Sequence, residues 1–270
     1  RFFVQSGLKA EERMPFELDA RRLGSFQHAA LEAFHMALED EGLRWHDLTP
    51  NQARELMEQI ISQTMKDFHE GLMEDKPVNR VTATALGQAL ETFIGVVIEW
   101  MSHYAFEPFG VEVAFGGKEP KIPAWEIELP KQGKMVFNGI IDRVDLYEAE
   151  GHPSLAIVID YKSGKKKPDE RLSWNGVQLQ LPVYLNVLNH AGSNKALGGG
   201  PIQPVGAFFT TLRSRYEGKS SRTEALHPEA AMESVRKAYQ HVGCFDLNVL
   251  SAMDQRDGAT KGEQFQYQLT

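Results

Sequence analysis

The sequence predicts an α/β fold in which a mixed central β-sheet is flanked by helices and preceded by a helical region. Three observations lead to this prediction. Long segments with helical periodicity come first, short segments with strand character follow between residues 107 and 161, and helical and strand patterns alternate thereafter. At 270 residues the chain is long enough for one large domain or two small ones. We expect one domain with three parts, a helical part at 1–106, a catalytic sheet and helix at 107–190, and a sheet extension with a C-terminal helix at 191–270.

Three helices are expected in the N-terminal part, after an extended segment at 1–20. Residues 21–39 are apolar on two faces, which predicts a mostly buried helix. The next helix begins at Thr49-Pro50-Asn51-Gln52, a capping-box sequence with proline at the first helical position. The polar stretch EDKPVNR separates it from a third helix at about 82–104. The second and third helices supply core residues and carry no site.

Four strands are expected in the middle of the chain, at 111–115, 125–129, 137–147 and 155–161. These segments are rich in β-branched and aromatic residues and have lengths typical of strands. The last two strands complete an antiparallel meander that begins the sheet. The elements that follow are a helix at about 174–189, a flexible loop at 191–201, a strand at 206–212 that extends the sheet, a helix at 228–242 and an edge strand at 265–269.

Two aspartates within the meander are the first candidates for chemistry. Asp142 and Asp160 both lie among apolar neighbours, and Lys162 follows Asp160 on the same face of its strand. A buried, ionised carboxylate must be neutralised, paired or bound to a metal. Two carboxylates with a lysine beside them suit Mg²⁺ and a water molecule. The alternative is a structural ion pair between Asp142 and either Arg143 or Lys162.

The overall charge does not indicate a nucleic-acid-binding protein, because the net charge is −8 and the isoelectric point is near 5.6. Positive charge is nevertheless concentrated locally after the second acidic strand. That cluster consists of Lys165, Lys166, Lys167 and Arg171, and a second set comprises Arg213, Arg215, Lys219 and Arg222. Either cluster is alternatively a solvated loop.

Four short motifs occur in a characteristic order: GSFQH at 24–28, GIIDRVD at 139–145, DYKSG at 160–164 and QLQLPVYL at 178–185. Together they resemble the RecB-like branch of the PD-(D/E)xK nuclease superfamily. The chain is most similar to the C-terminal nuclease domain of AddB-type helicase–nuclease subunits, which the opening stretch FFVQSGLKAEERMPFELDA also resembles. This resemblance implies a restriction-endonuclease-like core.

The resemblance also implies a metal site. In this branch a histidine of a G-x-x-x-H motif supplies a further ligand, and His28 fits that motif. Asp142, Asp160, the backbone carbonyl of Tyr161 and His28 would hold Mg²⁺ or Mn²⁺, while Lys162 would orient the attacking water. Without this context, a histidine in a buried helix is more often a core residue, which is how we interpret His35.

Further site residues follow from the same resemblance. Gln178 and Tyr184 match the family's Q-x-x-x-x-x-Y element, so Gln178 could hold the attacking water or a phosphate and Tyr184 could contact phosphate or sugar. Glu112 is a possible outer member of the site, because a glutamate upstream of the first aspartate sometimes joins the site in related nucleases. The DNA-binding residues would be Lys165, Lys166, Lys167 and Arg171.

The function implied is that of a metal-dependent DNA exonuclease working with a helicase in double-strand-break repair. No GxxxxGK[ST] motif occurs, so an ATP-driven motor would lie elsewhere, in another domain or subunit. Two alternatives stay open. One is a catalytically idle DNA-binding scaffold module, and the other is a stand-alone exonuclease similar to those of CRISPR adaptation.

Cysteine usage limits the cofactors. AddB-type nuclease domains commonly hold an iron–sulfur cluster through one cysteine before the core and three after it, whereas this chain has only Cys244. We therefore expect either a piece of a longer protein that lacks the cluster-binding ends or a family member without the cluster. No run of 18 apolar residues and no signal peptide is apparent, so we expect a cytoplasmic protein without a membrane partner.

Overall fold

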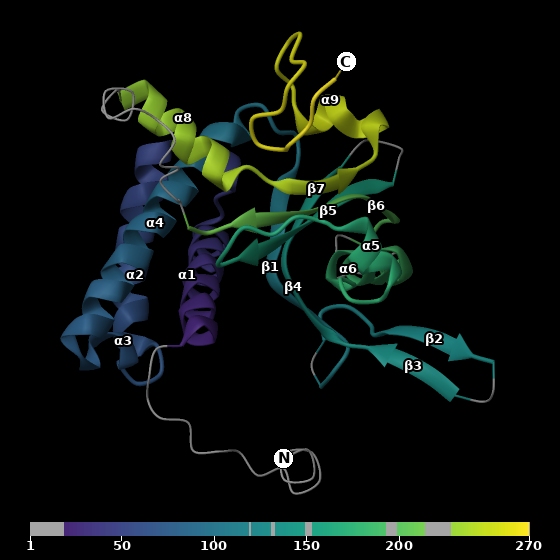
Figure 1. The fold of residues 1–270 in the computed structure, drawn as a ribbon, viewed down its shortest axis with the longest axis horizontal. Coiled ribbons are helices and arrows are strands. Elements are labelled where there is room, and N and C mark those ends of the chain that lie inside the picture. The colour runs from purple at the N-terminus through teal and green to yellow at the C-terminus, as the bar shows by residue number, and fades with distance from the viewer. Residues whose placement is uncertain are drawn as a thin grey trace, which may run out of the picture.

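The centre of the molecule is a five-stranded sheet in the order β1-β4-β5-β6-β7 (Figure 1). The computed structural model describes residues 19–118, 120–130, 133–148, 153–192, 199–213 and 228–269. The strands are β1 (Glu107–Phe115), β4 (Gly139–Tyr147), β5 (Ser154–Lys162), β6 (Ile202–Thr211) and β7 (Val242–Phe245). Antiparallel pairs join all neighbours except β5 and β6, which run parallel. This confirms the predicted mixed sheet.

Helices cover both faces of this sheet (Figure 1). Alternate residues of β5 contribute to two separate cores: Ile157, Ile159 and Tyr161 pack with α1, α2 and α4, whereas Ala156 and Val158 pack with α6. The helices are α1 (Ala20–Glu41), α2 (Pro50–Asp67), α3 (Leu72–Asp75), α4 (Pro77–Met101), α5 (Glu170–Trp174), α6 (Gln180–Ala191), α8 (Pro228–Tyr239) and α9 (Leu250–Met253). Short 3₁₀ turns lie at Trp45–Asp47 and Leu247–Val249.

The ends of the first two helices follow the local sequence. Asp19 caps α1 by accepting a hydrogen bond from the amide of Arg22, and α1 ends at Gly42, whose φ of 68° suits glycine. At the start of α2 the amide of Thr49 donates to Gln52 Oε1 at 2.9 Å, so the predicted capping box is present. These caps fix where α1 begins and hence where His28 lies.

Helix α4 begins earlier than the sequence suggested. The stretch EDKPVNR was expected to be a break, but α4 starts within it at Pro77, where a proline costs no helical hydrogen bond. By length and composition alone α4 could cross a membrane, and just over half of its most apolar part is buried inside the structure. Leu90, Phe93 and Ile94 are fully buried in the core, and α4 packs along α2, as expected of a core helix.

The predicted strand at 137–147 is in fact two strands, separated at Asn138. Its first residue ends β3 (Gly133–Phe137), which pairs with β2 (Trp125–Leu129) in a two-stranded hairpin that projects from the sheet (Figure 1). The strand period continues across both, so periodicity alone could not reveal the break. Pro108 and Gly110, expected to precede the first strand, lie inside β1 at a register shift.

Two predictions near the C-terminus are wrong in detail. The helix expected at 174–189 is divided into α5 and α6 by a turn in which Gly176 has a φ of 72°. The edge strand expected at 265–269 forms only isolated bridges, because the ring of Phe265 is drawn into the core against Phe208. The strand at 206–212 and the helix at 228–242 are present as β6 and α8. Residues 1–18, most of the loop at 191–201, and Arg215, Lys219 and Arg222 lie outside the described residues.

Candidate active site

Three elements bring a histidine and two carboxylates together at one end of the sheet. His28 projects from α1, and its Nδ1 lies 2.8 Å from Glu112 Oε1 of β1 and 3.8 Å from Asp142 Oδ1 of β4. One ligand atom from each of these three residues lies within 4.8 Å of the others. The structure therefore brings His28 and Asp142 together, as the sequence predicted, and adds Glu112 as a direct neighbour.

The position of Glu112 depends on an irregular backbone. Its φ is 50°, a left-handed value that is unfavourable for a residue other than glycine. The strand has shifted register between Pro108 and Gly110 just before it. Strained backbone of this kind persists where the surroundings hold it, often at functional sites. Strand alternation placed Glu112 on a face with Ala114 but could not predict this local conformation, so the contact with His28 was not foreseen.

Asp142 is buried and only partly neutralised. Its Oδ2 accepts a hydrogen bond of 2.7 Å from the amide of Tyr161. Burial raises the pKa of Asp142 to about 7, and the charge of Asp160 adds to this, while His28 acts in the opposite direction. The alternative in which Asp142 pairs with Arg143 is wrong, because the Arg143 guanidinium binds Asp145 instead.

Asp160 has no exposed surface, and its Oδ2 is in ion-pair contact with Lys162 Nζ. Burial raises the pKa of Asp160, and the charge of Lys162 opposes the rise. Among the described residues, Asp160 Oδ1 has no hydrogen-bond partner. Asp160 does not belong to the tight group formed by His28, Glu112 and Asp142, so it faces the site from the neighbouring strand rather than from within that group.

The backbone of Tyr161 is oriented toward β4. The carbonyl of Lys162 accepts a hydrogen bond from the amide of Leu212, on the β6 side of β5. Adjacent residues of a strand direct their backbone groups to opposite sides. The N–H of Tyr161 donates to Asp142, so its carbonyl is also directed to that side, as expected for a ligand. The ring of Tyr161 lies on the other face, edge-on to His28.

This donor set fits a divalent cation. Carboxylate and carbonyl oxygens with one imidazole are ligands that Mg²⁺ or Mn²⁺ accepts, the imidazole being better suited to Mn²⁺. The raised pKa values of Asp142 and Asp160 mean that burial has left their negative charge undercompensated. A cation would supply the missing charge and a partner for Asp160 Oδ1.

Gln178 does not lie on a helix, as was expected, but in the turn before α6. Its Oε1 accepts from the amide of Asp169 at 2.7 Å and its Nε2 donates to the carbonyl of Lys167 at 3.1 Å. Gln180, one helical turn before Tyr184, donates to the Tyr184 hydroxyl at 2.9 Å. That hydroxyl in turn donates to the carbonyl of Ile140 at 2.7 Å. The side chains of Gln178 and Tyr184 are thus engaged in holding the scaffold around the site.

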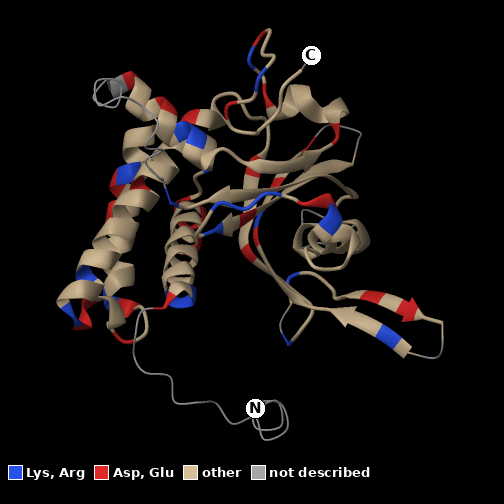
Figure 2. Cartoon of the chain, viewed as in Figure 1, with Lys and Arg blue, Asp and Glu red and all other residues tan. Residues whose placement is uncertain are grey.

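The basic loop follows β5 directly, and Figure 2 shows it as a blue segment between the sheet and α5. Lys166 Nζ lies 4.7 Å from the ring centroid of Phe209, and Lys162 Nζ lies 5.7 Å from the same ring. Burial and the charge of Lys162 lower the pKa of Lys166, and Asp160 opposes them. The loop therefore carries cations next to the site, whereas Arg213 of the second set is half-buried and lies beyond β6.

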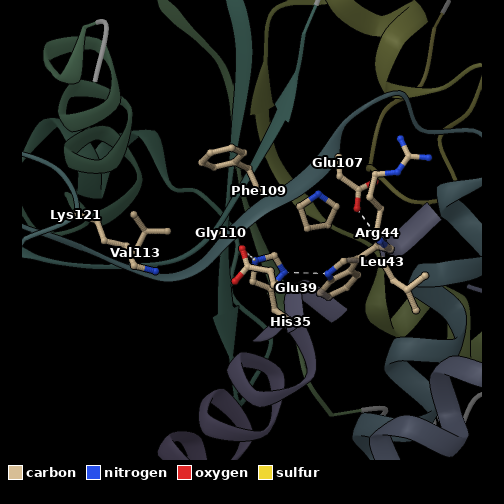
Figure 3. Close-up of a pocket in the computed structure, with 11 residues that line it drawn as sticks. His35, Glu39, Leu43, Arg44, Glu107, Phe109, Gly110, Val113 and Lys121 are labelled. Carbon is tan, nitrogen blue, oxygen red and sulfur yellow. Dashed lines mark hydrogen bonds and ion pairs between the residues drawn. The ribbon is translucent and has the colours of Figure 1, made fainter. Parts of the chain in front are cut away.

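A separate cavity of about 520 Å³ lies further along α1 and β1 (Figure 3). His35 and Glu39 of α1 face Phe109 and Val113 of β1 there, and neither Asp142 nor Asp160 lines it. The indole N–H of Trp45 donates to His35 Nδ1 at 3.1 Å, and burial lowers the pKa of His35. His35 is therefore a core residue, in agreement with its interpretation from the sequence.

A mixed sheet that carries this acid–lysine arrangement defines the class of protein. Residues 1–264 match the PD-(D/E)XK nuclease superfamily, and the chain belongs to this family. The curated relatives narrow the similarity. Proteins named as subunits of an ATP-dependent helicase/deoxyribonuclease, from Symbiobacterium thermophilum and from Clostridium perfringens strain 13, are each 32% identical to it over 94% of the chain. A protein of the same name from Alkaliphilus metalliredigens is 29% identical over 95% of it.

The chain spans about a fifth of the length of these relatives, 22%, 21% and 22% respectively. Their names describe a helicase and a deoxyribonuclease. The described residues correspond to the nuclease part, because their fold and acidic cluster account for the family match.

Proposed function

We propose that this chain is a metal-dependent deoxyribonuclease domain that hydrolyses DNA phosphodiester bonds. The observation that carries the proposal is the convergence of His28, Glu112 and Asp142 next to the buried Asp160–Lys162 pair. These residues come from α1, β1, β4 and β5, and they leave buried carboxylate charge undercompensated. Membership of a nuclease superfamily supports the same reaction.

His28, Asp142, Asp160 and the Tyr161 carbonyl would hold Mg²⁺ or Mn²⁺, with Glu112 either as a ligand or as the group that orients His28. A bound ion would lower the pKa of a water molecule and shield phosphate charge. The hydrogen bond between Glu112 and His28 Nδ1 leaves the other ring nitrogen of His28 available. The Tyr161 amide fixes Asp142, so the carboxylate is oriented before a ligand arrives.

Lys162 would orient the attacking water and stabilise negative charge that develops on the phosphate. Its ammonium is half-buried and in contact with Asp160, which keeps it charged and close to the acidic cluster. The basic loop would bind the DNA backbone. We find no element that would read base edges, so we propose that cleavage depends on strand type and ends rather than on base sequence.

We further propose that the domain works with a helicase, in the same polypeptide or in a partner subunit, in the processing of double-strand breaks. The support is similarity to proteins named as helicase/deoxyribonuclease subunits, of which this chain covers only a part. The same similarity favours this context over a stand-alone nuclease.

The test is cleavage of end-labelled single- and double-stranded DNA with Mg²⁺, Mn²⁺ or EDTA. The variants Asp160→Ala and Lys162→Ala should abolish metal-dependent cleavage, and Asp160→Ala should also weaken Mn²⁺ binding measured by calorimetry. A matched control exists on the β2–β3 hairpin, where Lys134 and Glu126 form an exposed pair at 2.6 Å. Lys134→Ala and Glu126→Ala should leave cleavage unchanged.

The outcomes separate the possibilities. Cleavage lost in both site variants and kept in both controls supports the proposal. Mn²⁺ binding that requires Asp160, without cleavage, would mean that the metal site exists and that the reaction needs the rest of the protein. Neither cleavage nor metal binding would leave the scaffold function as the better account.

A further inference from the structure

A tryptophan next to the basic loop is almost completely exposed. Trp174, the last residue of α5, has 91% of its surface exposed, more than any other large hydrophobic side chain in the described parts of the chain. Leu172, Val177 and Leu179 are also exposed, by 43%, 71% and 43%. Exposed apolar side chains gathered in one place commonly mark a binding surface. We refer to residues 169–179 as the α5 segment.

The backbone of the α5 segment is held firmly even though its apolar side chains are exposed. Asp169 caps α5 by accepting a hydrogen bond from the amide of Leu172 at 3.1 Å. The amide of Val177 donates back to the carbonyl of Leu172 at 2.8 Å, and Gln178 ties both Asp169 and Lys167 to the turn. The indole is therefore presented on a fixed support, which lowers the entropy lost when a ligand binds.

The α5 segment is connected to the proposed active site through Phe209. In the parallel pair of β5 and β6, Phe209 is the partner of Asp160. Its ring contacts the ammonium group of Lys166 in the basic loop. The next residue of that loop, Lys167, is bonded to Gln178 of the α5 segment. A strand that leaves the site along the basic loop would reach Trp174.

The chemistry of this surface suits a single-stranded nucleic acid. Lys165, Lys166, Lys167 and Arg171 carry positive charge in a protein whose net charge is −8, so an acidic backbone is attracted here specifically. An exposed indole offers a face on which an unpaired base can stack, and every base has such a face. In a duplex the bases are already stacked and cannot reach it.

We propose that Trp174 is a stacking platform for a base of single-stranded DNA held at the basic loop. The inference rests on the proposed nuclease function and extends it: the substrate strand is unpaired where it contacts the domain. Trp174 is a binding residue in this proposal, and the metal site does not depend on it.

The experiment measures binding of a labelled oligodeoxythymidylate of about 16 nucleotides, in EDTA so that no cleavage occurs. Trp174→Ala should weaken binding roughly 5- to 150-fold, the effect of losing one stacked base, whereas Trp174→Phe should retain most of it. Val177→Ala is the matched control, because it removes an exposed apolar side chain of the same segment and should leave the affinity unchanged. The parent protein's tryptophan fluorescence should be quenched on binding, and Trp174→Phe should lose most of that quenching.

An abasic oligonucleotide of the same length provides a second comparison, since parent and Trp174→Ala should bind it equally. Equal binding of the thymidylate strand by parent and Trp174→Ala would overturn the inference, and the α5 segment would then be a surface for a protein partner. Failure of the parent to bind single strands would overturn it as well. Trp174-dependent binding without metal-dependent cleavage would leave this inference standing while the proposed nuclease function fell.

Discussion

Two aspartates on β4, three residues apart, are buried in very different surroundings. Asp142 lies on one face of the strand and has one backbone amide and a half-buried histidine as its nearest polar partners. Asp145 lies on the other face with no exposed surface, and Arg143 Nε and Nη2 donate to its two oxygens at 2.6 and 2.7 Å. The Tyr104 hydroxyl donates a third hydrogen bond at 2.9 Å.

Asp145 is therefore compensated in full, whereas Asp142 is not. A bidentate guanidinium is a strong partner for a buried carboxylate. The guanidinium of Arg143 also lies 4.6 Å from the centre of the Trp45 ring, so the whole ion pair is enclosed by aromatic residues. Around Asp142 the second carboxylate, Asp160, adds negative charge and raises its pKa.

The difference separates structure from chemistry within a single strand. An ion pair such as Arg143–Asp145 needs no further ligand, while undercompensated carboxylates mark a site at which a cation would be stabilised. Variants on the two faces should consequently change different properties: stability on the Asp145 face, and metal binding and cleavage on the Asp142 face.

The largest effect should come from Asp160→Asn. We expect cleavage to fall by at least about a thousandfold, because a neutral amide no longer helps to hold the cation that the reaction needs. The free energy of unfolding in EDTA should be unchanged or higher, since a buried charge has been removed. Cleavage assays and urea denaturation in EDTA measure the two properties. A stability loss as large as the activity loss would contradict the division between the faces.

Asp145→Asn should give the opposite result. It leaves Arg143 buried beside a neutral amide, and breaking such a pair costs about 3–5 kcal/mol of unfolding free energy. Mn²⁺ affinity of the folded protein should stay close to that of the parent, because Asp145 faces away from the site. Urea denaturation and calorimetry test this. Asp142→Asn is the matched control on the same strand, and it should lower Mn²⁺ affinity without a comparable loss of stability.

The metal-free protein should show a smaller effect of pH. The pKa of Asp142 is raised from 3.8 to about 7 in the folded state, so the folded protein holds a proton that the unfolded chain has released. Its contribution to stability is complete below pH 4 and is lost as the pH rises through about 7, with a slope of at most about 1.4 kcal/mol per pH unit. Urea denaturation in EDTA between pH 5 and 8 should show this slope, and Asp142→Asn or added Mn²⁺ should reduce it. An unchanged slope in Asp142→Asn would refute the assignment.

The sequence predicted the parts of this molecule that depend on local patterns. The capping box at Thr49, the mixed sheet, and the proximity of His28 to Asp142 all follow from periodicity, from capping residues or from the family motifs. What it could not predict depends on contacts between distant segments. The left-handed backbone of Glu112 is an example, since no residue type requires it.

The assignment of roles within QLQLPVYL was limited for the same reason. The motif suggested that Gln178 and Tyr184 share a helix, but the turn at Gly176 ends α5, and α6 begins only at Gln180. The contact that forms is between Gln180 and Tyr184, four residues apart on α6. A glutamine two positions earlier therefore serves the loop that carries Lys167.

The smallest effect should come from Tyr184→Phe. The hydroxyl of Tyr184 is bonded to the carbonyl of Ile140, two residues before Asp142, and to Gln180, so we expect it to support β4 rather than to contact DNA. Its removal should lower the free energy of unfolding by about 1 kcal/mol and leave the cleavage rate close to that of the parent. Gln180→Leu should have a similar effect, and the double variant should lose less than the sum of the two because the residues share a hydrogen bond. A fall in cleavage of about tenfold or more with unchanged stability would instead mean that the hydroxyl contacts the phosphate or sugar of the substrate, as the family motif implied.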